Sequence, residues 1–275
     1  MPQPGRHLRE NRIVVTDQTL KDQHVLVTGA GTGIGAAIVV ACAKAGARVS
    51  LAGRRREPLA TVQASLAHAP THILPDFDVT DEAKVRAGIA SARSAFGSID
   101  ILVNNAGEAP SAPFVKTDLA TWNKALAVNV TGTFLVAREV VPDMVTRHSG
   151  RVINIASTAG LVGYAYVSAY VAAKHAVIGL TRSLALEFAR AGITVNAVCP
   201  GYTETPLLDR AVDNITAKTK RSRDDARAAL AASNPQGRLV TPEEVADTVL
   251  WLASPAAHSI TGQAIVVAGG EVMAG

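Results

Sequence analysis

The segment from residue 24 to residue 45 constrains the fold of this chain most strongly. A short apolar strand, His24–Thr28, leads into Thr28-Gly29-Ala30-Gly31-Thr32-Gly33-Ile34-Gly35, and a helical pattern, Ala36–Ala45, follows. Glycines let the backbone approach a pyrophosphate closely, and the helix N-terminus offers it N–H groups and a positive dipole. The segment therefore predicts the start of a dinucleotide-binding βαβ unit; the alternative is a tight turn without a ligand.

Strand and helix patterns continue to alternate along the 275 residues. Further strands are predicted at Arg48–Ala52, His72–Pro75, Ile101–Asn104, Arg151–Ile155, Thr194–Val198 and Ala264–Val267. Helices are predicted at Ala36–Ala45, Glu82–Phe96 and Thr121–Arg147, around Tyr170 as far as about Arg190, and at Pro242–Ala253. This alternation predicts an α/β protein with a single-domain Rossmann fold: a doubly wound, seven-stranded parallel sheet with helices on both faces.

Tyr170 and Lys174 are four residues apart in a helical run, so their side chains share one face of that helix. An ammonium near a phenol stabilises the phenolate and lowers the pKa of the phenol. Tyr170 could then exchange a proton near neutral pH as a general acid or base. Taken alone, the pair fits a solvated helix surface as well, because most such neighbours have unperturbed pKa values.

Three other polar residues occupy positions that need a reason. Asn129 lies inside a predicted helix, where asparagine is a poor helix former, and the alternative to a functional role is a satisfied core amide. Ser157 follows the carboxyl end of the fifth strand, where open α/β sheets bind ligands, although serine there can also be a cap. Asp78 could accept from an adenine amino group or cap the next helix, as Thr80 or Asp81 also could.

The residues after the second strand bear on cofactor choice. About twenty residues beyond the glycine turn, an NAD site would carry an acid for the ribose 2′-hydroxyl. This chain has Gly53 followed by Arg54, Arg55 and Arg56. Because arginine can clamp a 2′-phosphate with two hydrogen bonds, we expect NADP(H) to be favoured over NAD(H), the alternative being a solvated basic turn.

Charge and cysteine content argue against several functions. The formal net charge is only +4 and no aromatic residues interleave with the basic ones, so no nucleic-acid partner is expected. The two cysteines, Cys42 and Cys199, have neither metal-site nor disulfide spacing and are predicted to be buried in a reducing compartment. His68 and His72 straddle a loop instead of sharing a helix turn, so no metal site is expected.

Targeting signals are not expected either. Residues 1–11 are polar and basic, unlike a secretory signal, and no uncharged apolar run has membrane-spanning length. The longest candidate, Leu161–Leu180, contains Lys174 and His175. We therefore expect a soluble, cytoplasmic protein without a membrane partner.

Two boundaries divide the chain. Residues 1–20 lack periodicity and are expected to form an N-terminal extension, followed by one dinucleotide-binding and catalytic domain over residues 21–275. Within that domain the polar segment 205–237 has helical patches and no strand pattern. We expect this segment to be a lid over the substrate pocket.

Taken together, the motifs follow a familiar order over about residues 22–270. They are Thr28-Gly29-x-x-x-Gly33-x-Gly35, Asp78, Asn104-Asn105-Ala106-Gly107, Asn129, Ser157, Tyr170-x-x-x-Lys174, Pro200-Gly201 and Thr205. In this order they resemble the short-chain dehydrogenase/reductase family. The resemblance implies a Rossmann fold and an oligomer, usually a homotetramer or else a homodimer, with contacts through the final strand and helix.

The resemblance also implies the chemistry. Tyr170 would give its proton to a carbonyl oxygen as hydride arrives, or take that proton in the reverse direction. Lys174 would lower the pKa of Tyr170 and hold the nicotinamide ribose, Ser157 would orient the carbonyl, and Asn129 would hold a water. The implied cofactor-binding residues are Gly29, Thr32, Gly33, Ile34, Gly35, Arg54, Arg55, Asp78, Val79, Asn105, Ala106, Gly107, Tyr170, Lys174, Pro200, Gly201, Thr203 and Thr205. The implied substrate-binding residues are Ser157, Tyr164, Tyr170 and Tyr202.

Within the family the pattern is similar to ketoreductases of β-ketoacyl thioesters and polyketides and to hydroxyacyl dehydrogenases. Either a 3-oxoacyl thioester reductase or a 3-hydroxyacyl dehydrogenase would fit. The basic lid residues would then meet the phosphates of coenzyme A or of a carrier protein, unless they are a solvated charge run. These residues are Lys218, Lys220, Arg221 and Arg223.

Two departures from the family pattern stand out. Thr32 occupies a position where many NADP-preferring members carry a basic residue. The segment Ala268-Gly269-Gly270-Glu271 has alanine where an aspartate commonly precedes the paired glycines. A competing hypothesis is a non-catalytic, dinucleotide-sensing module that binds other proteins. All four expected catalytic residues, Asn129, Ser157, Tyr170 and Lys174, are present, and this favours an enzyme.

Overall fold

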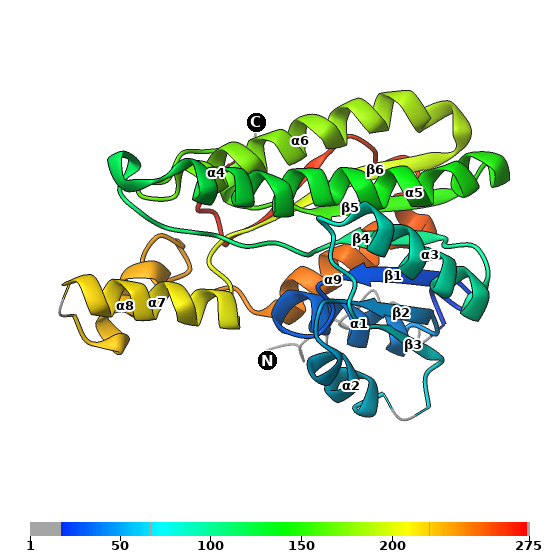
Figure 1. Cartoon of the computed structure of the whole chain (residues 1–275), viewed down its shortest axis with the longest axis horizontal. Coiled ribbons are helices and arrows are strands. Elements are labelled where there is room, and N and C mark those ends of the chain that lie inside the picture. Colours follow the sequence, from blue (N-terminus) through cyan, green and yellow to red (C-terminus); the bar gives the residue numbers. More distant parts are fainter. Residues whose placement is uncertain (1–17, 67, 220, 274–275) are drawn as a thin grey trace, which may run out of the picture.

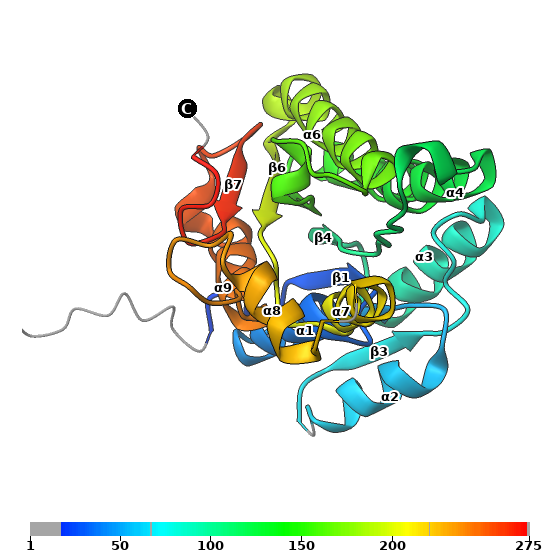
Figure 2. The ribbon, with the colours of Figure 1, turned by 90° about the vertical axis from the view of Figure 1, so that its left-hand side faces the viewer.

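A computed structural model describes residues 18–66, 68–219 and 221–273 of the chain. Within these residues, seven parallel strands form one sheet in the order β3-β2-β1-β4-β5-β6-β7 (Figures 1 and 2). The strands are β1 His24–Thr28, β2 Arg48–Ala52, β3 Thr71–Leu74, β4 Ile101–Asn104, β5 Gly150–Ile155, β6 Ile193–Pro200 and β7 Ala264–Val267. The strand order reverses between β1 and β4, and this confirms the predicted doubly wound Rossmann sheet.

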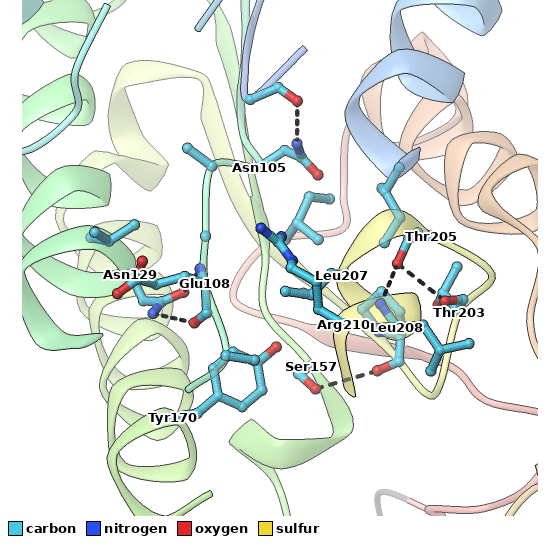
Figure 3. Close-up of a pocket in the computed structure, with 18 of the residues that line it drawn as sticks. Asn105, Glu108, Asn129, Ser157, Tyr170, Thr203, Thr205, Leu207, Leu208 and Arg210 are labelled. Atoms are coloured by element: carbon cyan, nitrogen blue, oxygen red, sulfur yellow. Dashed lines mark hydrogen bonds between the residues drawn. The ribbon is translucent and has the colours of Figure 1, made fainter. Parts of the chain in front are cut away.

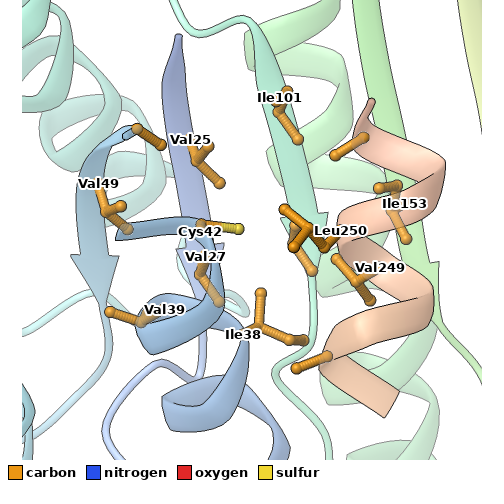
Figure 4. Close-up of a cluster of buried hydrophobic side chains, with 14 of the residues drawn as sticks. Val25, Val27, Ile38, Val39, Cys42, Val49, Ile101, Ile153, Val249 and Leu250 are labelled. Carbon is orange, nitrogen blue, oxygen red and sulfur yellow. The ribbon is translucent and has the colours of Figure 1, made fainter. Parts of the chain in front are cut away.

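Helices cover both faces of the sheet. They are α1 Gly33–Lys44, α2 Arg56–Ala64, α3 Glu82–Phe96, α4 Leu119–Leu126, α5 Gly132–Arg147, α6 Ser168–Phe188, α7 Pro206–Thr219, α8 Arg223–Ala231 and α9 Pro242–Ala253. On one face α1 and α9 enclose a core with β1, β2, β4 and β5, in which Cys42 lies among valines and isoleucines (Figure 4). On the other face α3 and α5 build a second core. Cys42 and Cys199 are both free and buried, as predicted.

Element boundaries agree closely with the predicted pattern, but three elements differ: β6, α2 and the predicted helix Thr121–Arg147, which divides into α4, a π-helical turn and α5. Strand β6 is longer than predicted and includes Pro200, the last residue of the strand. Helix α2 was not predicted. Pro58 lies in the first turn of α2, where its missing N–H costs no intrahelical hydrogen bond.

The expected N-terminal extension lies almost entirely outside the described residues. Leu20, the last residue of that extension, is only 1% exposed and belongs to the core beside α1. Its N–H donates to the carbonyl of Ala45 over 2.8 Å. The folded part of the chain therefore includes residue 20.

One helical run, Leu119–Arg147, is long and apolar enough to cross a membrane by length and composition. Half of its most apolar window is buried inside the fold, where α5 packs on α3 and on the sheet. The core helix of a folded domain meets the same criteria, so this finding is weak evidence for a membrane span.

A buried histidine at the start of β1 predicts a pH-dependent stability. His24 is 0% exposed, its Nδ1 lies 2.9 Å from the carbonyl oxygen of Gly97, and its Nε2 lies 2.9 Å from Ser50 Oγ. Burial lowers the pKa of His24 below its ordinary value, although Gly97 and Asp100 oppose the shift. The unfolded chain therefore takes up this proton at a higher pH than the folded protein does.

The stabilisation from neutral His24 is present above pH of about 6.5 and is lost as the pH falls through the lowered folded-state pKa. One proton contributes a slope of at most about 1.4 kcal/mol per pH unit to the unfolding free energy. We expect His24→Gln to remove that slope in urea unfolding between mildly acidic and neutral pH. An unchanged slope in the variant would contradict the role of His24.

Candidate active site

A cavity of about 600 Å³ opens at the carboxyl ends of β1, β4, β5 and β6 (Figure 3). Every residue predicted for catalysis, cofactor or substrate lines this cavity except Gly33 and Gly35. Residues from both halves of the sheet therefore converge at the switch point between β1 and β4, where open α/β sheets bind ligands.

Gly35 packs closely against the backbone of Gly29, in the turn after β1. A Cβ at Gly35 would lie 2.2 Å from the carbonyl oxygen of Gly29 and 2.5 Å from Asn105 Nδ2, so no side chain fits there. Asn105 Nδ2 donates to the carbonyls of Thr28 and Gly29 over 2.9 and 3.2 Å, and this ties the end of β4 to the turn. The close approach of α1 to β1 thus explains why Gly35 does not face the cavity.

The N-terminus of α1 fits the pyrophosphate of a dinucleotide. Thr32, the residue before the helix, makes no side-chain capping hydrogen bond, and no acid lies in the first turn. The first N–H groups of a helix lack internal acceptors and attract anions. Together with the glycine turn they would hold the phosphates.

Asp78 does not cap the following helix. Asp81 takes that role, because its carboxylate accepts from the N–H groups of Ala83 and Lys84 at the start of α3. Asp78 Oδ1 accepts from the N–H and the hydroxyl of Thr80, and the Thr80 N–H chiefly, with a smaller contribution from Arg54, lowers the pKa of Asp78. Asp78 thus lines the cavity as a carboxylate, able to accept from an adenine amino group.

Arg54 and Arg55 line the same end of the cavity, and Arg56 does not. Both side chains are exposed, and in the described part of the chain neither has a hydrogen bond or ion pair. Arg54 interacts with Asp78 through its charge alone, so both guanidiniums can still hydrogen-bond a phosphate at this end.

Asn129 interrupts the expected long helix. Residues Ala127–Thr131 form one π-helical turn (η2) between α4 and α5, and such turns are frequent at functional sites. Asn129 Nδ2 donates to the carbonyls of Glu108 and Ala125, each over 2.9 Å. A Cβ at Gly107 would lie 2.8 Å from Asn129 Oδ1 and 3.7 Å from Lys174 Nζ, so these two polar groups converge beside Gly107.

Tyr170, Lys174 and Ser157 meet at the floor of the cavity. Lys174 is buried; its Nζ donates to the carbonyl of Ile155 over 2.7 Å and lies 5.6 Å from the centre of the Tyr170 ring. Ser157 follows β5, its Oγ donates to the Pro200 carbonyl over 3.5 Å, and its hydroxyl is close enough to Tyr170 to act on the pKa of that phenol. The hydroxyls of Ser157 and Tyr170 can therefore meet one carbonyl oxygen between them.

The pKa expected for Tyr170 was wrong for the free protein. Burial raises the pKa of Tyr170 to about 12, and the hydrogen bond with Ser157 acts in the opposite direction without overcoming it. Burial also lowers the pKa of Lys174 to about 8. Desolvation is thus the main cause of the pKa shift of each group.

A buried polar chain fixes α6 on the sheet beneath these residues. Asn104 Nδ2 donates to Asn154 Oδ1, and Asn154 Nδ2 donates to Thr181 Oγ1, each over 2.9 Å. These contacts join β4, β5 and α6 in the interior, although Asn104 Oδ1 is buried without a hydrogen-bond partner. These two hydrogen bonds hold α6, the helix that carries Tyr170, in place over the strand ends.

Comparison with known proteins identifies the family. A family model described as Enoyl-(Acyl carrier protein) reductase matches residues 29–271. The chain belongs to the short-chain dehydrogenase/reductase family. It is an oxidoreductase that transfers a hydride between a nicotinamide cofactor and a ketone or secondary alcohol, as predicted.

Individual relatives agree with this assignment. The chain is 39% identical to 2-(S)-hydroxypropyl-CoM dehydrogenase 3 of Xanthobacter autotrophicus over 91% of this chain and 97% of that protein. It is 41% identical to cis-4-hydroxycyclohexanecarboxylate dehydrogenase of Sinomonas cyclohexanicum over 92% and 98%. A crystal structure of actinorhodin polyketide ketoreductase with NADPH is 36% identical and superposes with a TM-score of 0.88 over 93% of this chain and 99% of that one. These relatives favour an enzyme over the non-catalytic module.

The substrate end of this dehydrogenase/reductase has an acid that the sequence analysis did not place there. Glu271 Oε1 accepts from the Tyr164 hydroxyl over 2.8 Å, and Tyr164 packs edge-on against Tyr202 with ring centres 6.2 Å apart. Burial, with a smaller contribution from Glu271, raises the pKa of Tyr164, so its hydroxyl stays protonated. Glu271 thereby holds the ring that walls this end of the cavity.

The predicted lid consists of α7 and α8. The Asn214 side chain on α7 donates to Ser111 Oγ over 2.5 Å, and this contact joins the lid to the loop after β4 across the cavity mouth. Within the described residues, segment 205–237 contains no strand, as predicted.

Lys218, Arg221 and Arg223 of the basic lid residues do not line the cavity. Arg223 forms ion pairs with Asp213 and Asp209 on α7, Lys218 and Arg221 lie away from the cavity lining, and Lys220 is outside the described residues. The expected contact between these residues and substrate phosphates therefore has no structural support. Glu108 and Arg210 line the cavity instead; Arg210 could have been found from its helical spacing of three residues after Leu207.

Proposed function

We propose that this enzyme interconverts a ketone and a secondary alcohol with Tyr170 as the proton donor and acceptor. The observation that supports this most directly is the meeting of Tyr170, Ser157 and Lys174 at the cavity floor. Ser157 would orient the carbonyl oxygen, and Tyr170 would supply the proton that balances the hydride. Lys174 would hold the nicotinamide ribose, and Asn129 would link Lys174 to solvent through a water.

The cofactor supplies or accepts the hydride, and we propose that it is NADP(H) in preference to NAD(H). The glycine turn and the α1 N-terminus would hold its phosphates, and Asp78 with Val79 would hold the adenine. Arg54 and Arg55 would pair with the 2′-phosphate. Two observations support this preference: neither arginine side chain forms a hydrogen bond or an ion pair in the described chain, and a ketoreductase of the same fold was solved with NADPH.

The proposed substrate has a largely apolar body beside its carbonyl. Leu207, Leu208 and Ile215 of the lid and the Tyr164 and Tyr202 rings line that end of the cavity. A 3-oxoacyl thioester or a hydroxy acid fits these walls. The first is supported by similarity to a polyketide ketoreductase, and the second by similarity to a dehydrogenase of hydroxycyclohexanecarboxylate.

We propose a homotetramer or homodimer in the cytoplasm. Large apolar side chains on three helices are exposed in the single chain, including Leu119 at 71%, Leu186 at 84% and Trp251 at 38%. Burial of such side chains between subunits would be favourable. Two free, buried cysteines suit a reducing compartment.

Arg54→Ala tests the cofactor preference. Loss of a charge-assisted contact to a phosphate should raise the Kd for NADPH about tenfold to a hundredfold and leave the Kd for NADH unchanged. Calorimetric titration of both cofactors measures this difference. Arg56→Ala is the matched control, because Arg56 does not line the cavity. Equal losses for both cofactors, or no loss for either, would refute a 2′-phosphate contact at Arg54.

A further inference from the structure

Helix α7 presents one face to the cavity. Leu207, Arg210, Ala211 and Ile215 line it at helical spacing. Leu208 and Val212 are buried in a small core with Ala226 of α8, and this core fixes how α7 is turned. Figure 3 shows the Arg210 side chain reaching from α7 into the space between Asn105 and Tyr170. A cation thus projects into the cavity from the lid.

The Arg210 guanidinium has no hydrogen-bond or ion-pair partner among the described residues. Two other lid arginines are paired: Arg227 contacts Glu204 over 2.9 Å and Asp209 over 3.5 Å, and Arg223 also contacts Asp209. Asp209, the residue before Arg210, therefore already forms ion pairs with Arg223 and Arg227. Arg210 alone of these three arginines faces the cavity.

The acids that line the cavity are also engaged elsewhere. Glu108 Oε2 lies 3.2 Å from Lys124 Nζ, and Asp78 accepts from Thr80 at the adenosine end. Neither is an ion-pair partner of Arg210 in the described chain. The Arg210 side chain is exposed at the cavity wall, so a ligand in the cavity can reach it. Its planar guanidinium matches carboxylate and phosphate oxygens and favours an anionic ligand.

The lid also restrains where Arg210 can move. Asn214 is one helical turn beyond Arg210 on the same side of α7, and its contact with Ser111 holds α7 against the loop after β4. One turn and a half before Arg210, Thr205 packs beside the glycine turn. Arg210 therefore lies on α7 between two contacts that hold this helix in place, one at Thr205 and one at Asn214.

Resting on the proposed function, we infer that Arg210 binds an oxyanion group of a ligand in this cavity. The oxyanion comes from one of two sources: the pyrophosphate of the dinucleotide, or a carboxylate, sulfonate or phosphate on the substrate. Both sources present the same pair of charged oxygens to the guanidinium. Arg210 would thereby close the lid over an anionic ligand and select for it.

Binding measurements on Arg210→Gln and Arg210→Lys test the inference and separate the two sources. In one arm NADPH is titrated calorimetrically into the apoprotein. In the other arm short-chain 3-oxo acids and their methyl esters are titrated in the presence of NADP⁺, so that no turnover occurs. Arg221→Gln is the control, because Arg221 is on the lid but does not line the cavity.

We expect Arg210→Gln to weaken one ligand class about tenfold to a hundredfold, with a smaller loss in Arg210→Lys and none in the control. A loss for NADPH assigns the oxyanion to the cofactor; a loss for the acids but not for their esters assigns it to the substrate. Unchanged affinity for every ligand that the parent binds would overturn the inference. If the parent binds NADPH but turns over no ketone or alcohol, the proposed function fails, while the binding arms still decide the role of Arg210.

Discussion

Tyr170→Phe should lower kcat by about a thousandfold while leaving the Kd for the cofactor within about twofold. A positioned general acid or base contributes about a hundredfold to ten-thousandfold to the rate, and this substitution removes the only atom that carries the proton. The ring remains, so the wall of the cavity and the cation–ring contact with Lys174 are retained. Steady-state kinetics and calorimetric titration of the same preparation measure the two quantities.

Tyr202→Phe is the matched control for that experiment. Tyr202 also lines the cavity, and its ring packs edge-on against Tyr164. Loss of this hydroxyl should change KM more than kcat, because Tyr202 is proposed to contact the substrate body and not the reacting oxygen. If Tyr170→Phe kept a normal kcat, or if both variants lost kcat equally, proton transfer by Tyr170 would be wrong.

The fold could be predicted because buried parallel strands have a simple sequence signature. Residues 24–28, 48–52 and 101–104 are short runs rich in valine, leucine and isoleucine, each followed by glycine or asparagine, and each matches an observed strand. The family and the reaction class could be predicted from motifs that lie at the ends of those strands. Because the fold brings those ends together, the predicted site residues other than Gly33 and Gly35 line one cavity; their roles remain predictions.

Features that depend on long-range contacts could not be predicted. Tyr164 and Glu271 are 107 residues apart, and no local pattern links them. The ion pairs of Arg223 are set by how α8 turns against α7, and this decides that Arg223 points away from the cavity. The pKa of Tyr170 depends on how deeply its hydroxyl is buried, a property that spacing to Lys174 does not contain.

Gly35→Ala should both destabilise the protein and abolish tight cofactor binding. The added Cβ would lie 2.2 Å from the carbonyl oxygen of Gly29, which is backbone and cannot swing aside as a side chain could. To relieve this clash, either α1 must move away from β1, or the turn at Gly29, which would face the pyrophosphate, must move. We expect the free energy of unfolding to fall by about 2–3 kcal/mol, typical of overpacking, and the Kd for NADPH to rise at least about a hundredfold.

Gly179→Ala provides the matched control, because Gly179 is an exposed residue within α6 with no atom within 4 Å of an added Cβ. Since alanine is the better helix former, this variant should gain about 1 kcal/mol in unfolding free energy and keep its Kd for NADPH. Urea unfolding and cofactor titration of both variants make the comparison. If Gly35→Ala were as stable as Gly179→Ala and still bound NADPH tightly, α1 could not pack against the turn as closely as described. The pyrophosphate would then have to be held elsewhere than at the start of α1.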